Sequence, residues 1–532
     1  MNLLTDPFLS ISNKQGQEQT LCFAEISHPD FIHLRTPRAD FTGAAYQFAI
    51  AVLQTCFAPE TEQDWEELYQ NPPSREQLAQ ALTKIEHAFH LTGDQPLFMQ
   101  DFHTLDKIGG LSPVASLLIE APGGSTLKNN IDHFVKRGTC ESMSLPMAAL
   151  ALFTLQTNAP SGGVGHRTGL RGGGPLTNLV MPHDEKASLW QKLWLNVLTQ
   201  EHVDEKNNKL FNKQPINFHD GSIFPWLAPT KESDKAGSEL YPTQVHYLHM
   251  YWAMPRRIRL KIDQDIQSCD MTGIMPQQSV SQFWAKNYGH NYSGSWCHPF
   301  THYRRDLKKP EKEDLSTKAQ PGGVMYKQWQ SLVLAHEDGK EGSIPAQVVM
   351  AFEDRAYYFL QNETSYPKLW SFGYDMDNMK ARCWYSKEMP LFAKNPDSRA
   401  IFLDACKSLI EAVDASVREC RYKIKAALSS RPKDLKGDLS HIDLAFYQQT
   451  ETAFFDLLGQ VAQSGCLSDQ MKSTWHRTLE AKSFTLFDQF ALTSIEESHL
   501  QRRIEQRKRL SLFFHPNSKT FKNFLTNKEH KV

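Results

Sequence analysis

Four long amphipathic stretches near the end of this 532-residue sequence restrict its fold more than any other feature. Apolar residues recur there at the three- and four-residue spacing of a helix, over residues 398–428, 438–462, 467–492 and 495–514. Signals that end helices separate the stretches, at Arg431-Pro432, at Gly465 and close to Thr493. Long helices with short connections predict an antiparallel four-helix bundle, which we assign to residues 393–532.

Residues 1–392 lack this regularity and predict one large, irregular mixed domain, so the expected fold class is α+β. Helical spacing and capping residues predict helices, and short apolar runs bounded by polar residues predict strands. The predicted helices are residues 40–57 with Asp40 as N-cap, 74–90, 145–155 and 187–199, and the predicted strands include 344–352 and 356–360.

The charge balance excludes a uniformly basic nucleic-acid protein, because 58 Lys and Arg residues face 60 Asp and Glu residues. The balance is uneven, since residues 398–532 hold 21 basic and 16 acidic residues. Nine scattered cysteines without a paired motif favour a reducing compartment. No signal peptide and no apolar run of about 20 residues is visible, so we expect a cytoplasmic protein without a membrane partner.

The most unusual segment, residues 158–174, contains seven glycines between positions 161 and 174. It is neither a Walker A loop nor a dinucleotide fingerprint, because the required spacing and the Gly-Lys-Ser/Thr ending are missing. Glycines let a backbone approach another surface closely, and Arg167 and Arg171 add positive charge nearby. A narrow DNA minor groove is a suitable target, and a plain flexible loop is the alternative.

Basic clusters elsewhere raise the case for nucleic-acid binding. Residues 256–261 alternate, which would put several charges on one strand face. In the last bundle helix a basic cluster is expected to contact phosphates rather than bases, and it comprises Arg502, Arg503, Arg507, Lys508 and Arg509.

Signatures of catalysis and of metal binding are missing from the sequence. His290, Cys297, His298 and His302 lie close together, but their spacing matches no standard zinc pattern. The sequence therefore predicts no catalytic residue, no metal and no cofactor.

Several short motifs, in their order and spacing, make the sequence resemble a known family. They are Met1-Asn2-Leu3-Leu4, Pro96–Gln100, Asn158-Ala-Pro with the following glycines, Thr168–Gly173, Trp296-x-His298-Pro299 and Gly373-Tyr374, followed by the helical bundle. Together they resemble the large subunit (CasA family) of the type I-E CRISPR surveillance complex Cascade, over nearly the whole chain.

This resemblance implies a non-catalytic subunit of a guide-RNA complex. Such a subunit binds double-stranded target DNA, reads the protospacer-adjacent motif (PAM), starts strand separation and helps to recruit a helicase–nuclease. The implied partners are the other Cascade subunits, the guide CRISPR RNA, the target DNA and that helicase–nuclease. Protein then reads only the short motif, while base pairing with the guide reads the long sequence.

The resemblance also assigns roles to individual residues. The loop that enters the minor groove at the PAM corresponds to Ser161, Gly162, Gly163, Val164 and Gly165, and the PAM-contacting lysine falls at Lys286 or Asn287. The strand-separating wedge corresponds to Asp377, Asn378 and Met379, and an aromatic that contacts the guide-RNA handle corresponds to Phe134.

One departure from the family concerns zinc, which some members hold with two cysteine pairs. In this chain the second cysteine of each pair is replaced, by Met143 after Cys140 and by Thr272 after Cys269, so we expect no structural zinc. Two other interpretations stay open, a cytoplasmic enzyme such as a nuclease with a Gly-rich substrate loop, and a structural bundle protein without DNA contact.

Overall fold

The computed structural model describes the chain with several gaps, as residues 1–94, 96–122, 128–129, 138–319, 323–337, 339–359, 366–377, 380–392, 399–433, 439–493 and 499–526. The chain forms two compact units. Unit 1 comprises Met1–Gly323, Leu334–Phe352 and Pro367–Glu388, and unit 2 comprises Val324–Val333, Glu353–Tyr366 and Met389–Val532. The division predicted at residue 393 stays a prediction, and unit 2 also takes in two segments that precede it in the sequence.

The core of unit 1 surrounds α1 (Ala39–Cys56), a helix that is buried along almost its whole length. Its Phe48 ring contacts the rings of six other aromatic residues, among them Phe153 of α5 (Leu145–Asn158) and Trp252. Edge-to-face pairs of this kind add to the gain from burying large apolar surfaces. The other helices of this region are α2 (Glu62–Gln70), α3 (Arg75–Leu82), α6 (Leu189–Trp194), α7 (Gln200–Leu210) and α9 (Gln347–Phe359, which continues into unit 2).

Among the described residues, four small antiparallel sheets complete unit 1, and the end of β14 runs into unit 2. In sheet order they are β2 (Glu18–Leu21), β1 (Leu9–Asn13) and β3 (Phe31–Leu34); β10 (Leu315–Ser316), β9 (Tyr303–Asp306), β12 (Glu341–Ile344) and β11 (His336–Glu337); β14 (Lys380–Pro390), β13 (Lys368–Asp377) and β6 (Thr177–Met181); and β4 (Gly110–Pro113), β8 (Ser279–Lys286) and β5 (Met143–Ser144), with β7 (Arg257–Ile262) also paired to β8.

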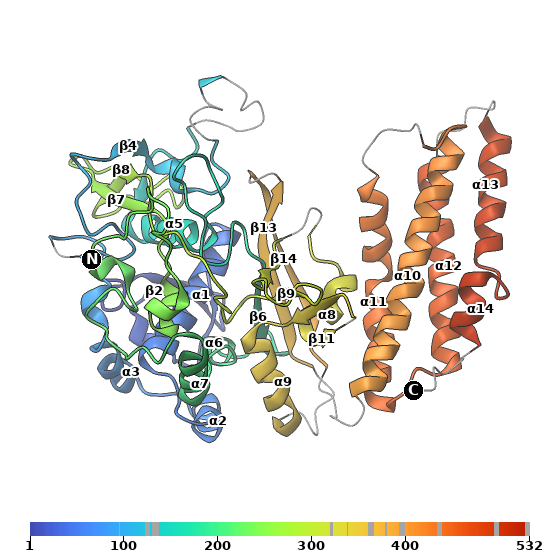
Figure 1. The fold of residues 1–532 in the computed structure, drawn as a ribbon, viewed down its shortest axis with the longest axis horizontal. Coiled ribbons are helices and arrows are strands. Elements are labelled where there is room, and N and C mark those ends of the chain that lie inside the picture. Colours follow the sequence, from blue (N-terminus) through green and yellow to red (C-terminus); the bar gives the residue numbers. More distant parts are fainter. Residues whose placement is uncertain are drawn as a thin grey trace. The chain divides into compact units, whose positions relative to one another are not determined.

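Unit 2 contains the four-helix bundle, which confirms the predicted fold class (Figure 1). Two contacts show that α10 and α11 run antiparallel, since Arg421 pairs with Asp443 while Tyr447 donates a hydrogen bond to Asp414, further back along α10. Tyr326 stacks on Phe454 at 4.3 Å, so residues 324–333 pack on the bundle. The helices are α8 (Trp329–Val333), α10 (Arg399–Leu428), α11 (Ser440–Ser464), α12 (Asp469–Ala491), α13 (Leu500–Phe513) and a short α14 (Lys519–Leu525).

Two strand predictions and one capping prediction are wrong. The strands expected over 344–352 and 356–360 are largely one helix, α9, because Val348, Val349 and Phe352 bury one helical face, although valine is β-branched and favours strands. Asp40 is not the N-cap of α1; that position belongs to Arg38, whose guanidinium pairs with the Asp40 carboxylate at 2.7 Å. In the described part of the chain, no helix combines the length and the apolar character that a membrane span requires.

Candidate nucleic-acid interface

The glycine loop, residues 161–165, follows α5, which ends at Asn158, and has an exposed tip. Val164 is 79% exposed, and Gly162 and Gly163 are also exposed. Gly163 and Gly165 adopt positive φ angles of 107° and 76°, which side-chain-bearing residues rarely adopt. The loop therefore presents backbone and one small apolar side chain, with little bulk to keep a ligand away.

Two hydrogen bonds fasten the glycine loop to the segment that follows β8. Asn287 Nδ2 donates to the carbonyl of Val164 at 2.8 Å, and the Tyr288 backbone N–H donates to the carbonyl of Gly165 at 2.8 Å. A Cβ at Gly165 would lie 2.8 Å from Cβ of Asn287, so only glycine fits this approach. The structure thus brings together the glycine loop, Lys286 and Asn287. The family resemblance had assigned each of them to PAM contact.

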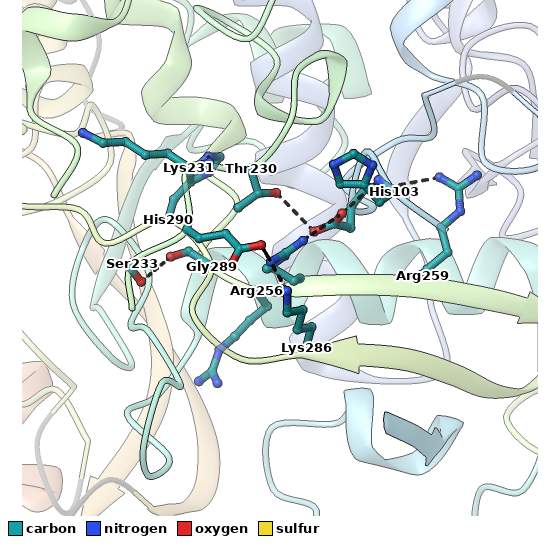
Figure 2. A network of polar contacts seen from close by, with 12 residues as sticks. His103, Thr230, Lys231, Ser233, Arg256, Arg259, Lys286, Gly289 and His290 are labelled. Carbon is teal, nitrogen blue, oxygen red and sulfur yellow. Dashed lines mark hydrogen bonds and ion pairs between the residues drawn. The ribbon is translucent and has the colours of Figure 1, made fainter. Parts of the chain in front are cut away.

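Lys286 ends β8 and faces an acidic partner from another segment (Figure 2). Its Nζ lies 3.0 Å from Glu232 Oε1, and the same oxygen accepts a 2.6 Å hydrogen bond from Arg257 Nη1. Arg257 and Lys286 are directly opposed in the β7–β8 register, which explains why both reach one carboxylate. The hydrogen bonds from Arg257 and Lys286 lower the pKa of Glu232.

Arg257 is itself held by a buried carboxylate. Its Nε donates to Asp101 Oδ2 at 2.6 Å, and the two side chains are 1% and 0% exposed. Asp101 also accepts hydrogen bonds from Thr230 Oγ1 at 3.2 Å and from the His103 backbone N–H at 2.9 Å. Arg257 therefore does not offer a solvent-exposed charge, although the sequence pattern placed it in a basic cluster.

The two arginines of the Gly-rich segment have different roles. Arg167 lies over the Tyr288 ring, 5.9 Å from its centre, and donates to Ser233 Oγ at 2.7 Å. It therefore packs on the residue whose backbone holds the glycine loop. Arg171 is only 3% exposed and donates to Gln47 Oε1 and Thr177 Oγ1, both at 2.9 Å. Burial lowers the pKa of Arg171 to about 10. The expectation that Arg171 adds surface charge is wrong, because its guanidinium organises the core.

The wedge prediction falls on the connection between β13 and β14. Near it, Tyr374 Oη donates to Asp40 Oδ2 at 2.5 Å, and Arg382 of β14 pairs with Asp375 of β13 at 2.9 Å. β13 ends at Asp377 and β14 begins at Lys380. Asn378 and Met379 lie outside the described residues, as does Phe134, so these assignments stay predictions.

The basic residues of α13 are mostly engaged within the bundle. Arg503 is 7% exposed, Arg502 Nε donates to the carbonyl of Ala427, and Arg507 forms a bidentate pair with Asp488 at 2.7 and 2.9 Å. Arg509 pairs with Glu505 one turn away, at 2.5 Å. Lys508 is exposed and makes no ion pair within the described part of the chain.

The possible metal ligands do not converge in the described ranges, where no group of three or more His, Cys, Asp or Glu side chains could hold an ion. His302 donates or accepts hydrogen bonds with Thr317 Oγ1 at 2.6 Å and Ser343 Oγ at 2.7 Å. Asp270, next to Cys269, accepts hydrogen bonds from the backbone N–H groups of Glu141 and Ser142. The segments around Cys140 and Cys269 are therefore joined by hydrogen bonds.

Comparison with known proteins identifies the family. The model of the CRISPR-associated protein Cse1 family matches residues 2–486 of the chain. The chain belongs to the Cse1 family. One matched structure, from Thermus thermophilus, carries both names, CasA and Cse1, so the family inferred from the sequence motifs is confirmed. Cse1 proteins are non-catalytic Cascade subunits.

Solved Cse1 structures share the fold at low sequence identity. Thermobifida fusca Cse1 is 16% identical with a TM-score of 0.69, and 99% of each chain is covered. CasA from Thermus thermophilus is also 16% identical, with a TM-score of 0.68 and coverage of 97% of this chain and 99% of that one. A chain from a structure named CRISPR RNA-guided surveillance complex is 12% identical, with a TM-score of 0.66 and coverage of 96% and 99%.

The sequence did not reveal the residues that support this interface in the Cse1 chain. Glu232 belongs to no recognisable sequence motif. Asp101 directly follows the Pro96–Gln100 motif, but no sequence pattern marks it as a binding or supporting residue. Tyr288 has a left-handed φ of 67°, a conformation that costs energy for a residue with a side chain. The alternating charges of residues 256–261 drew attention to the strand that carries Arg257, but they predicted exposed cations where Arg257 is buried.

Proposed function

We propose that this Cse1 chain reads the PAM of double-stranded DNA and starts strand opening beside it, as the large subunit of a guide-RNA complex. The observation that carries the proposal is the attachment of the glycine loop to Asn287 and Tyr288, next to Lys286. A backbone without Cβ atoms can enter a narrow minor groove, and ammonium and amide groups can donate to the base acceptors there.

The partners follow from the family and from the surveillance-complex structure that shares this fold. We infer that other Cascade subunits and the guide CRISPR RNA bind this chain, and that a helicase–nuclease is recruited after the DNA opens. Base pairing with the guide then reads the long target, while the chain reads only the flanking motif. We expect this complex to bind its target DNA in the cytoplasm.

The bundle is a second, weaker DNA contact in this proposal. An exposed Lys508 can approach a phosphate directly, whereas Arg507 must first leave the Asp488 carboxylate. Neutralising one cation that contacts phosphate lowers the salt dependence of binding by roughly 0.7–0.9 in log–log slope. Lys508→Ala should therefore change that slope more than Arg507→Ala, with no change in sequence preference.

The deciding experiment presents the assembled complex with a library of duplexes that share one guide-matched target and carry a randomised flanking sequence. The parent complex should enrich a short motif, and Gly165→Asp should flatten that enrichment, because it adds bulk and a negative charge where the loop meets Asn287. The loss should be about 1–3 kcal/mol for the enriched motif, the usual cost of one misread base pair.

Two results would contradict the proposal. Equal enrichment by the parent and the Gly165→Asp complex would remove the glycine loop from PAM reading. Cleavage of labelled duplex by the isolated chain with a divalent metal would restore the nuclease alternative. Gel filtration of each variant complex shows whether assembly is intact.

A further inference from the structure

Lys286 is neutralised within the protein before any DNA arrives. Its partner Glu232 is 44% exposed and offers one oxygen to both Lys286 and Arg257. Asp101 balances Arg257, so the two carboxylates and two cations of this quartet sum to zero charge. A lysine in this state attracts a passing phosphate less strongly than a free ammonium group does.

The backbone around Glu232 is fixed to the segment that follows Lys286 (Figure 2). The Lys231 backbone N–H donates to His290 Nε2 at 3.2 Å, and the Ser233 backbone N–H donates to the carbonyl of Tyr288 at 3.2 Å. Ser233 Oγ also donates to the carbonyl of Gly289 at 2.6 Å. Glu232 therefore lies between two residues that are hydrogen-bonded to the segment after Lys286. These bonds fix the backbone of Glu232 relative to Lys286, so the ion pair is not set by side-chain rotation alone.

The environment of Gly289 keeps this segment in place. A Cβ at Gly289 would lie 2.1 Å from the carbonyl oxygen of Pro255, two residues before β7 begins at Arg257. The strands that carry Arg257 and Lys286, the Glu232 segment and the glycine loop therefore form one framework, in which Glu232 is the only member of the charged quartet more than one-third exposed.

We propose that Glu232 sets the sequence discrimination of the interface by competing with DNA for Lys286. This inference rests on the proposed PAM-reading function. A phosphate, being an anion, must displace Glu232 to engage Lys286, whereas a neutral base acceptor can take one of the three ammonium N–H groups while Glu232 keeps another. Only a groove that accepts the glycine loop brings a base acceptor to Lys286, so a duplex with the motif avoids that displacement. Glu232 thus weakens binding to duplexes without the motif more than binding to duplexes with it, a repulsive contribution to specificity.

The test compares the complexes of the parent chain and Glu232→Gln on duplexes with and without the enriched motif. Glutamine keeps an oxygen for Arg257, whose ion pair with Asp101 is untouched, but it no longer neutralises Lys286. Affinity for the duplex without the motif should rise about three- to tenfold, with a salt slope steeper by roughly 0.9, as expected for one added phosphate contact. Affinity for the motif duplex should rise by less than twofold.

Lys286→Ala provides the control background. Because Glu232 acts through Lys286, Glu232→Gln should have no effect in the Lys286→Ala complex. Glu205→Gln is the matched surface control, since Glu205 is 51% exposed and pairs with Lys209 on α7. If the Glu232→Gln complex is thermally destabilised, Glu232→Asp replaces it; its shorter side chain cannot span both cations, and discrimination should fall in the same direction.

Three results would overturn the inference: no change in discrimination, an equal gain on both duplexes, or an effect that persists without Lys286. Each of these leaves the proposed function standing if Lys286→Ala and Gly165→Asp still weaken binding to the motif duplex. If neither of those two variants alters motif binding, the proposed function itself fails, and the inference fails with it.

Discussion

Replacing Gly165 by alanine tests how the glycine loop is held. The substitution has two structural costs, because Gly165 has a φ of 76° and its Cβ would meet Asn287 Cβ at 2.8 Å. Two ring carbons of Tyr288 lie at 3.1 and 3.2 Å from the same point. The Asn287 Cβ is bonded to the backbone, so the loop must move away and cannot rely on a side-chain rotation.

A matched glycine separates the cost of the left-handed backbone from the cost of the steric contact with Asn287. Gly16, in the turn between β1 and β2, has a φ of 77° and nothing within 4 Å of its added Cβ. Alanine at either site carries the left-handed cost of about 1–2 kcal/mol. At Gly165 the displaced loop also weakens the hydrogen bonds to Asn287 and Tyr288, each worth about 1 kcal/mol. Binding to the motif duplex should therefore fall by about 2–3 kcal/mol, or roughly 30- to 150-fold.

The assay measures equilibrium binding of the parent, Gly16→Ala and Gly165→Ala complexes to duplexes with and without the enriched motif. Gly16→Ala should lower the thermal midpoint of the chain slightly and leave DNA binding unchanged. Gly165→Ala should lose motif binding while its affinity for other duplexes stays close to that of the parent. If Gly165→Ala binds the motif duplex as tightly as Gly16→Ala does, the close approach to Asn287 does not position a DNA-reading loop.

Three further predictions concern the core, the pH dependence and the wedge. Arg171→Met should lower the free energy of unfolding by about 3 kcal/mol or more in denaturant titrations, because it leaves Gln47, Thr177 and Thr301 without their buried donor. Burial lowers the pKa of His290 to about 4, and its Nε2 accepts a hydrogen bond from Lys231 N–H, so the folded state keeps the ring neutral. Its stabilising contribution is complete above the ordinary pKa of about 6.5 and declines as the pH falls towards 4, by about 2 kcal/mol at pH 5; thermal melts of His290→Gln should show a weaker decline than the parent. Asn378→Gly with Met379→Gly should slow strand opening on intact duplex, measured by fluorescence of a base analogue, and pre-mismatched target bases should restore the rate; equal impairment on both duplexes would argue against a wedge.

Local patterns explain why the bundle could be predicted from the sequence. The observed α10, Arg399–Leu428, differs by one residue from the stretch assigned by helical spacing, and Gly465 ends α11 with a left-handed φ of 73°. Such features depend on neighbouring residues only. The strands expected over 344–352 and 356–360 were wrong for the opposite reason, because a short apolar run with valines fits both a strand and a helix until its burial partners are known.

The candidate site was only partly accessible to sequence reasoning. Glycines marked a loop that can approach another surface, but they could not show that residues 287 and 288, more than 120 positions away, hold it. Nor could the sequence distinguish Arg167, which supports the loop, from Arg171, which is buried in the core. Burial and pairing of a charge are decided by contacts distant along the chain, and motifs carry no record of them.

The position of the glycine loop and the charge of Lys286 both depend on the residue 232–233 segment and on Tyr288, which is hydrogen-bonded to it. Tyr288 donates to the glycine loop through its N–H and accepts from Ser233 through its carbonyl, while Glu232, beside Ser233, holds Lys286. A phosphate that displaces Glu232 therefore acts on the segment that also anchors the loop. In the proposed interface, shape recognition by Gly165 and charge recognition by Lys286 are then energetically coupled, and a double-mutant cycle between Gly165→Ala and Glu232→Gln should give a non-additive effect on motif binding. Strict additivity would mean that the two elements read DNA independently, despite the hydrogen bonds that join them.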